Sequence, residues 1–148
     1  MPANQNIIIL HSASTGESEK QKGAEVDLSS VFANSVKKAV RTVILDQKDH
    51  LEVTDRLQTG DKEAAVSWIM VTPAEAKITG KNRMELTKDG QRMLLTVDAD
   101  TEVEMKTWSN VPPHEYDFRN PGTIRVGFET VIPANRAVQL KVRLIPLK

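Results

Sequence analysis

Short runs of alternating apolar and polar residues recur from Ala64 to the end of this chain, and this period-two pattern constrains the fold more than any other feature. Successive side chains of a β-strand point to opposite faces of a sheet, so each run predicts a strand with one buried face and one wet face. The clearest apolar positions are Ile124, Val126 and Phe128, followed by Val138, Leu140, Val142 and Leu144. Several such strands in succession predict an all-β domain with little or no helix and about 9 to 11 strands.

Two connections between these runs carry turn signals. Asp89-Gly90 separates an apolar-alternating run at 84–86 from one at 93–97, and Asp-Gly is a strong hairpin signal. Pro133-Ala134-Asn135 forms a polar break between the runs at 124–129 and 138–144. We therefore expect a hairpin at each of these two places, with the last two strands of the chain paired to each other.

The run 64–72 differs from the others because it is apolar at both alternating sets of positions. Such a run is typical of a central strand covered on both faces. Trp68 lies in the middle of this run, which predicts that it is a core anchor rather than a ligand platform. Arg41, Arg56 and Arg125 also fall in strand contexts, where we expect them to form surface ion pairs.

The segment 28–45 fits two structures. Its apolar residues match a helical stripe with Asp27 as a cap, whereas Val40, Thr42, Val43 and Ile44 are β-branched and lead into a polar turn at 46–49. We favour a short turn followed by a strand. Residues 11–24 are rich in Ser, Gly, Glu and Lys, and we expect a mobile loop there after a first strand at 7–10.

Length and charge limit the class of protein. The chain has 148 residues, which fits one domain spanning 1–148. Lys+Arg and Asp+Glu both number 20, so the positive field that nucleic acids and anionic membranes select is missing from the sequence. No apolar run approaches the roughly 20 residues that span a bilayer. We expect neither nucleic acid nor a membrane as a partner.

Catalytic and metal-binding motifs are weak in this sequence. There is no cysteine, and the three histidines, His11, His50 and His114, are far apart. Asp98, Asp100 and the following Glu102 alternate like the start of a calcium loop, but the Gly and the later Glu of that motif are missing. We therefore predict no metal, no cofactor and no catalytic residue in this chain.

The segment 108–122 is the chemically densest part of the chain. Aromatic rings can stack on the apolar faces of sugars, while amide and guanidinium groups match hydroxyl and carboxylate oxygens. The candidate substrate-binding residues are Trp108, Asn110, His114, Tyr116 and Arg119. The alternative is structural: Pro112, Pro113 and Pro121 stiffen a long connection whose aromatics cap one end of the fold.

Several segments, taken in order, resemble the C-terminal region of the heparinase II/III-like polysaccharide lyases. They are Ala-Glu-Val-Asp-Leu-Ser-Ser-Val-Phe at 24–32, the strand at 40–45, His-Leu-Glu-Val-Thr-Asp-Arg-Leu at 50–57, Val-Ser-Trp-Ile-Met-Val-Thr-Pro at 66–73, the Asp-Gly hairpin, and Tyr-Asp followed by Asn-Pro-Gly at 116–122. The resemblance implies an antiparallel two-sheet β-sandwich and a periplasmic or secreted protein. A His-Asn pair of the family would fall at Gln5 and Asn6, and because Gln5 departs from it no metal ligand is carried over.

The resemblance also implies that the catalytic residues lie in a different part of the protein. Family members cleave uronic-acid-containing polysaccharides by β-elimination, and their catalytic Tyr, His and Asn lie in parts that precede the matched region. The chain is thus expected to be a non-catalytic β-sandwich domain whose partners are the catalytic portion of a lyase and an acidic polysaccharide, with a homodimer through exposed sheet edges. The rival hypothesis is a stand-alone carbohydrate-binding module that uses the 108–122 loop.

Overall fold

The computed structural model describes residues 7–11, 21–109 and 122–147. These residues form antiparallel strands and connections, and no helix occurs among them, hence none that is long and apolar enough to cross a membrane. The eleven strands are β1 (Ile7–His11), β2 (Gln21–Asp27), β3 (Lys38–Asp46), β4 (Leu51–Gln58), β5 (Ala64–Thr72), β6 (Glu75–Gly80), β7 (Arg83–Lys88), β8 (Gln91–Ala99), β9 (Val103–Ser109), β10 (Ile124–Ile132) and β11 (Ala137–Leu147).

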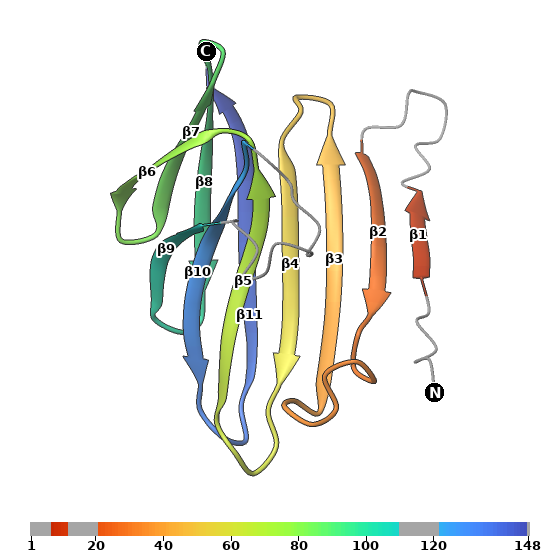
Figure 1. The fold of residues 1–148 in the computed structure, drawn as a ribbon. Helices are drawn as coiled ribbons and strands as arrows, with labels where there is room; N and C mark the ends of the chain where they lie inside the picture. The colour runs from red at the N-terminus through yellow and green to blue at the C-terminus, as the bar shows by residue number, and fades with distance from the viewer. Residues whose placement is uncertain (1–6, 12–20, 110–121, 148) are drawn as a thin grey trace, which may run out of the picture.

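The strands build two layers, as Figure 1 shows. One sheet has eight strands in the order β1-β2-β3-β4-β11-β8-β7-β6, and the other has three in the order β5-β10-β9. All pairings are antiparallel. The predicted all-β fold with two antiparallel sheets is confirmed.

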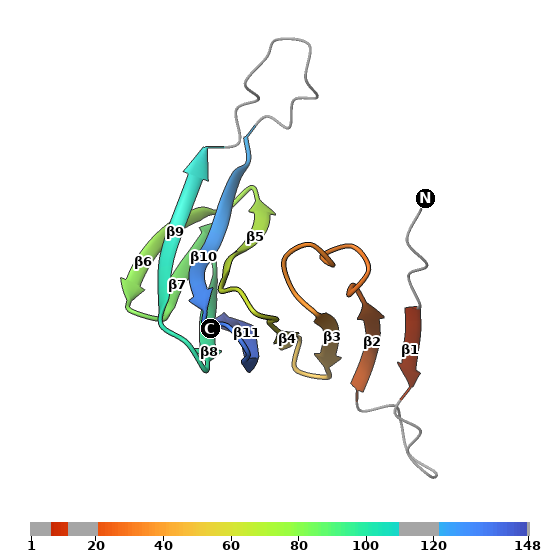
Figure 2. The ribbon, with the colours of Figure 1, turned by 90° about the horizontal axis from the view of Figure 1, so that it is seen from below.

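The two layers differ in width. Seen along the strands, the small sheet lies over one half of the large sheet, while β1, β2 and β3 extend beyond it (Figure 2). The core fills the space where the layers overlap, and its buried side chains come from β4, β5, β7, β8, β9, β10 and β11. Trp68 and Phe128 stack there with ring centroids 6.0 Å apart, and Trp68 is only 6% exposed, so its predicted role as a core anchor is confirmed.

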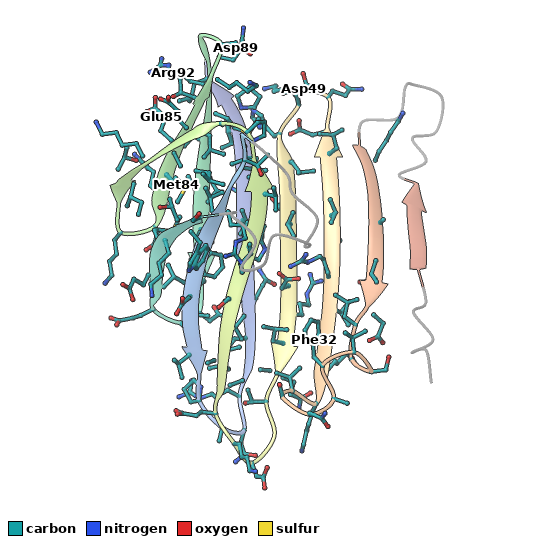
Figure 3. The ribbon with its side chains drawn as sticks, in the orientation of Figure 1. Phe32, Asp49, Met84, Glu85, Asp89 and Arg92 are labelled. Atoms are coloured by element: carbon teal, nitrogen blue, oxygen red, sulfur yellow. The ribbon has the colours of Figure 1, made fainter. Side chains whose placement is uncertain are left out.

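The Asp89-Gly90 hairpin forms as predicted. Strands β7 and β8 pair up to Lys88 and Gln91, which leaves a two-residue turn. Asp89 and Gly90 both have positive φ, 51° and 77°, which is the conformation of a type I′ turn. Figure 3 labels Asp89 at this tip of the large sheet.

The segment 28–45 also takes the predicted form, a turn followed by a strand. The N–H groups of Val31 and Phe32 bond to the Leu28 carbonyl, and the turn closes before β3 begins at Lys38. The carboxylate of Asp27 accepts a hydrogen bond from the N–H of Ser29, and its bonds with Ser29 hold the pKa of Asp27 below its usual value. The apolar residues that suggested a helix instead fold this turn over the large sheet, where Leu28 and Val36 pack with Ala39 and Ala64.

The predicted pairing of the last two strands is wrong. Strand β10 pairs with β5 and β9, whereas β11 pairs with β4 and β8, so the connection 133–136 crosses between the layers. Thr59 binds this connection on both sides. Its hydroxyl donates to the Pro133 carbonyl at 2.6 Å and accepts from the N–H of Arg136 at 3.0 Å. The β4–β5 connection, which also crosses between the layers, therefore lies against the 133–136 connection and is bonded to it.

The prediction that 64–72 is a central strand covered on both faces is also wrong for this chain by itself. Strand β5 is an edge strand of the small sheet. Its inner face packs in the core through Trp68, but Ile69 and Val71 on its outer face are 45% and 48% exposed. The loop expected at 11–24 is shorter at both ends, since His11 belongs to β1 and β2 begins at Gln21; residues 12–20 lie outside the described part of the chain.

Candidate glycan-binding face

The site predicted from the sequence is only partly described. Trp108 lies near the end of β9, which ends at Ser109 opposite Ile124, the first residue of β10. Asn110, His114, Tyr116 and Arg119 lie outside the described residues, so the structure does not test whether they converge. The two strand ends beside Trp108 flank the segment that carries them.

Arg125 is the residue that the structure places beside Trp108. Antiparallel pairing puts Arg125 directly opposite Trp108 on one side and Val71 on the other, and cross-strand partners share a sheet face. The guanidinium donates from Nε and Nη2 to the Ser109 carbonyl at 3.3 and 3.0 Å. The expected ion pair is thus replaced by bonds to a neutral acceptor, and the positive charge of Arg125 is not cancelled by them.

Farther along this outer face, the next cation is ion-paired. Gly127 lies opposite Ile69 and Lys106, and Lys106 Nζ is 3.3 Å from Glu129 Oε1. The Lys106 charge is balanced by this ion pair. Hence the end of the face near Trp108 combines an aromatic ring with a guanidinium, which are the groups that recognise a sugar ring and its carboxylate.

Sequence reasoning missed Arg125 for a definite reason. The alternation of residues in 124–129 assigns Arg125 to the wet face, but the alternation of one strand does not reveal which residue of another strand lies beside it. The register of β9 against β10 supplies that information. A charge on the wet face next to an aromatic-rich loop is the signal that would have pointed to it.

The outer face of the large sheet carries a shallow groove of about 650 Å³ at the ends of β2, β3, β4 and β11. Its cations are Lys38 and Arg56, and its acids are Glu25, Asp27 and Asp100. Because acids outnumber cations here, the groove is a poor match for a polyanionic glycan.

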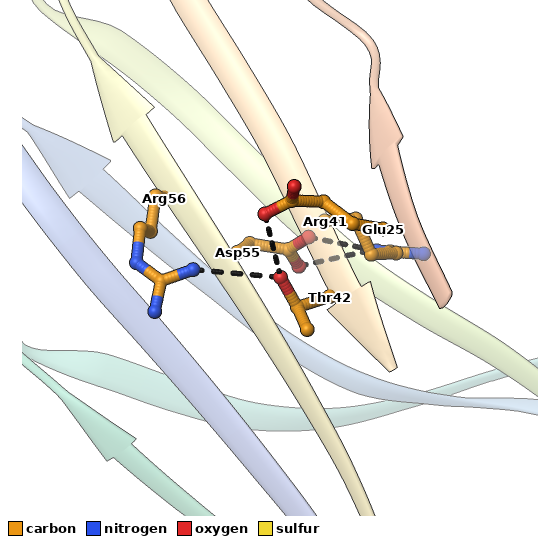
Figure 4. A network of polar contacts seen from close by, with 5 residues as sticks. All are labelled: Glu25, Arg41, Thr42, Asp55 and Arg56. Carbon is orange, nitrogen blue, oxygen red and sulfur yellow. Dashed lines mark hydrogen bonds and ion pairs between the residues drawn. The ribbon is translucent and has the colours of Figure 1, made fainter. Parts of the chain in front are cut away.

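Three pairs of polar side chains bond across strands of the large sheet at this level, two on the groove face and one on the opposite face (Figure 4). Thr42 Oγ1 lies 3.4 Å from both Glu25 Oε1 and Arg56 Nη1, so Arg56 bonds to a hydroxyl rather than forming the expected ion pair. Arg41 does form the expected ion pair: its Nε and Nη2 bond to both carboxylate oxygens of Asp55 at 2.7 and 2.9 Å. Asp55 is buried, and its hydrogen bond raises the pKa of Arg41.

Three described titratable side chains, His50, Asp46 and Asp100, hold turns and sheet contacts. His50 Nδ1 is 3.5 Å from Asp46 Oδ2 within the β3–β4 turn. In the described part of the chain, no three His, Cys, Asp or Glu side chains gather as a metal site. Asp100, from the alternating acidic run, accepts the N–H of Gln139 at 2.8 Å and so ties β11 to the end of β8.

Comparison with known proteins places this fold. No family model matches the sequence, and no curated protein matches it. Among solved structures, a crystal structure of heparinase III covers 95% of this chain at a TM-score of 0.65 and 13% sequence identity. The chain shares its fold with part of heparinase III.

Two further heparinase structures agree. A heparinase III gene product with methylated lysines covers 95% of the chain at a TM-score of 0.61 and 15% identity, and a heparan sulfate lyase mutant from Pedobacter heparinus covers 96% at 0.58 and 16%. The chain spans only 21 or 22% of these proteins. What it matches is therefore one β-sheet portion of the heparinase III structures and not the whole of them.

Proposed function

We propose that this chain is a β-sandwich domain of the heparinase II/III-like lyase type, which supports the catalytic portion of a polysaccharide lyase and carries no complete active site. The observation behind the proposal is the heparinase III fold, which extends over 95% of this chain but only 21% of the heparinase. A lyase reaction needs a base, a proton donor and a group that neutralises the sugar carboxylate, all within reach of one sugar. Among the described residues, His50 contacts Asp46 in the β3–β4 turn, and Asp100 bonds to β11.

The proposal extends to substrate and location. The whole assembly would act on an acidic, uronate-containing polysaccharide by β-elimination, and it would be periplasmic or secreted, where such glycans are found. The test is the sequence of the open reading frame and its neighbours around this chain. We expect a helical toroid encoded with it; a genomic context without any such segment would count against the supporting role.

A second candidate function rests on Trp108 and Arg125. Their side-by-side placement on the outer face of β9 and β10 favours direct contact with an acidic sugar. In this form the chain acts as a carbohydrate-binding module, alone or within the lyase. The two candidates differ in whether the chain by itself binds glycan.

Affinity electrophoresis in gels containing heparin, alginate or chondroitin separates them. If the face binds glycan, Trp108→Ala and Arg125→Gln each remove most of the retardation, while Arg83→Gln on the exposed surface of β7 is the matched control and leaves it unchanged. Retardation that Arg125→Gln and Arg83→Gln lose equally, and that Trp108→Ala keeps, would indicate general charge attraction. A native chain that migrates freely in every gel would exclude the binding module and leave the supporting role.

A further inference from the structure

Arg125 is held in one orientation by the end of the neighbouring strand. Its Nε and Nη2 both donate to the carbonyl oxygen of Ser109, at 3.3 and 3.0 Å. A guanidinium has five N–H donors in a planar fork, and these two bonds use only one side of it. The terminal pair of donors, one on Nη1 and one on Nη2, is not used by Ser109. Such a pair matches the two oxygens of an acidic group.

The positive charge of Arg125 is not neutralised within the described part of the chain. None of the ion pairs there includes Arg125, whereas Lys106 on the same face is paired with Glu129. Glu104 and Glu129 lie four residues farther along β9 and β10. That separation is about 13 Å along the strands, which exceeds the screening length of about 8 Å at physiological salt. The end of the face near Trp108 is therefore positive.

Exposed aliphatic side chains lie on the other side of Arg125. Val71 is its cross-strand partner on β5, and Ile69 lies two residues earlier on the same face. These two side chains are 48% and 45% exposed, and we call them the aliphatic shelf. Trp108, on the opposite side of Arg125, is half-buried. The row from Val71 to Trp108 spans two strand spacings, about 9.6 Å, which is close to the length of about two pyranose rings.

We propose that Arg125 determines which glycans this face binds, because its guanidinium binds an acidic group of the sugar chain. The glycan lies across the strands, with one ring on Trp108 and the next on the aliphatic shelf. Carboxylate and sulfate groups both offer two oxygens to a guanidinium, so the ligand is a glycan that carries either group. The Ser109 carbonyl is a positioning group: it orders Arg125 before the ligand binds, so less side-chain entropy is lost on binding.

The inference rests on the second candidate function, glycan binding beside Trp108. It adds a requirement for an acidic group and a second apolar contact surface. Affinity electrophoresis of the full chain tests the requirement in three gels: alginate carries carboxylates alone, dextran sulfate carries sulfates alone, and dextran is neutral. We expect retardation in at least one acidic gel and none in dextran. The gel that retards the chain identifies the acidic group.

Arg125→Lys separates the fork from the charge. Lysine keeps the positive charge but cannot offer two parallel donors or the bonds to Ser109, so the dissociation constant should rise at least about tenfold. Arg83→Lys, on the exposed surface of β7, is the matched control and should have no effect. If Arg125→Lys binds as tightly as the native chain, charge alone is sufficient and the inference is overturned.

Two valines of the outer face test the aliphatic shelf. Val71 and Val131 are similarly exposed, at 48% and 52%, but Val131 lies six residues along β10 from Arg125, about 20 Å away. Val71→Ser should weaken binding about threefold to tenfold, because apolar contact area is lost. Val131→Ser should leave binding unchanged. Circular dichroism checks that each variant is folded, and Ile69→Ser is the second shelf variant if Val71→Ser is not.

The outcomes distinguish a failure of the inference from a failure of the second candidate function. A native chain that none of the three gels retards would overturn both. Retardation that Trp108→Ala abolishes, but that Arg125→Lys and both shelf variants keep, would overturn the inference alone. Retardation in neutral dextran as strong as in the acidic gels would do the same, because the face would then bind glycan without an acidic group.

Discussion

Gly127 is the residue on which the small sheet most depends. A Cβ at this position would overlap the carbonyl oxygen of Trp68 on the neighbouring strand, and its φ of 156° is one that L side chains rarely adopt. The absence of a side chain lets β5 and β10 approach each other where Trp68 and Phe128 stack. A glycine inside a strand usually weakens it, so this one marks a close backbone approach.

We expect Gly127→Ala to lower the free energy of unfolding by about 3 kcal/mol or more, because the clash is with backbone and cannot be relieved by a rotamer change. Urea titration followed by circular dichroism measures the loss. Gly90→Ala is the control: Gly90 has a φ of 77° but nothing within 4 Å of an added Cβ, so only backbone strain of about 1 kcal/mol is expected. Equal losses in the two variants would contradict the close-approach explanation.

At the scale of elements, the β3–β4 turn is stabilised by one carboxylate. Asp46 Oδ1 accepts the N–H groups of Lys48 and His50 at 2.8 and 3.0 Å, while Asp49 takes the positive φ of 60° that the turn requires. The backbone bond from His50 is the main cause that lowers the pKa of Asp46 below its ordinary 3.8. The ionised form is the better acceptor, so the turn is held best when Asp46 is charged.

This predicts a pH dependence with a definite sign. The folded pKa of Asp46 is below the unfolded one, so its contribution to stability is fully present above about pH 3.8 and is lost as the pH falls through the folded pKa. Asp46→Asn should therefore be less stable than the native chain at neutral pH and equally stable in strong acid. Urea midpoints measured across this range check it. A difference that persists unchanged into acid would show that the carboxylate charge is not involved.

The 133–136 connection between β10 and β11 is held by Thr59, which is 1% exposed. We expect Thr59→Val, which keeps the shape but removes the hydroxyl, to cost about 1 to 3 kcal/mol because the Pro133 carbonyl and the Arg136 N–H lose their partner. Thr59→Ser keeps the hydroxyl and should cost less. Chemical denaturation of the two variants measures both values. If Thr59→Ser and Thr59→Val destabilise the chain equally, the hydrogen bonds of the hydroxyl are not what stabilises the 133–136 connection.

Local sequence patterns predicted some of the elements and their connections, but not all of them. Alternation located the strands and Asp-Gly located the β7–β8 hairpin, because both signals are contained in neighbouring residues. Pro133-Ala134-Asn135 looked like the same kind of signal, yet it joins two layers. The difference lies in contacts far away in sequence: β11 pairs with β4 and β8, and the connection bonds to the hydroxyl of Thr59, 74 residues from Pro133. No pattern local to 133–135 contains these contacts.

At the scale of the whole molecule, the sandwich was implied by a resemblance and is confirmed by the structure, but its unequal layers were not predicted. The apolar sequence of β5 predicted a strand covered on both faces, whereas Ile69 and Val71 on its outer face are exposed. For the candidate site, Trp108 was predicted and Arg125 was not. Their proximity depends on the register of β9 and β10. The alternation within each strand does not show which residues of separate strands lie side by side.

We propose that this β-sandwich, whose fold is shared with part of heparinase III, supports catalysis without performing it. The most direct test incubates the purified chain with heparan sulfate, heparin, alginate and chondroitin and follows the absorbance of the unsaturated uronate that β-elimination creates, with a heparinase III as the positive control. We predict no increase above the protein-free blank. An increase proportional to the concentration of this chain, and retained through repeated purification, would show that the chain itself catalyses β-elimination.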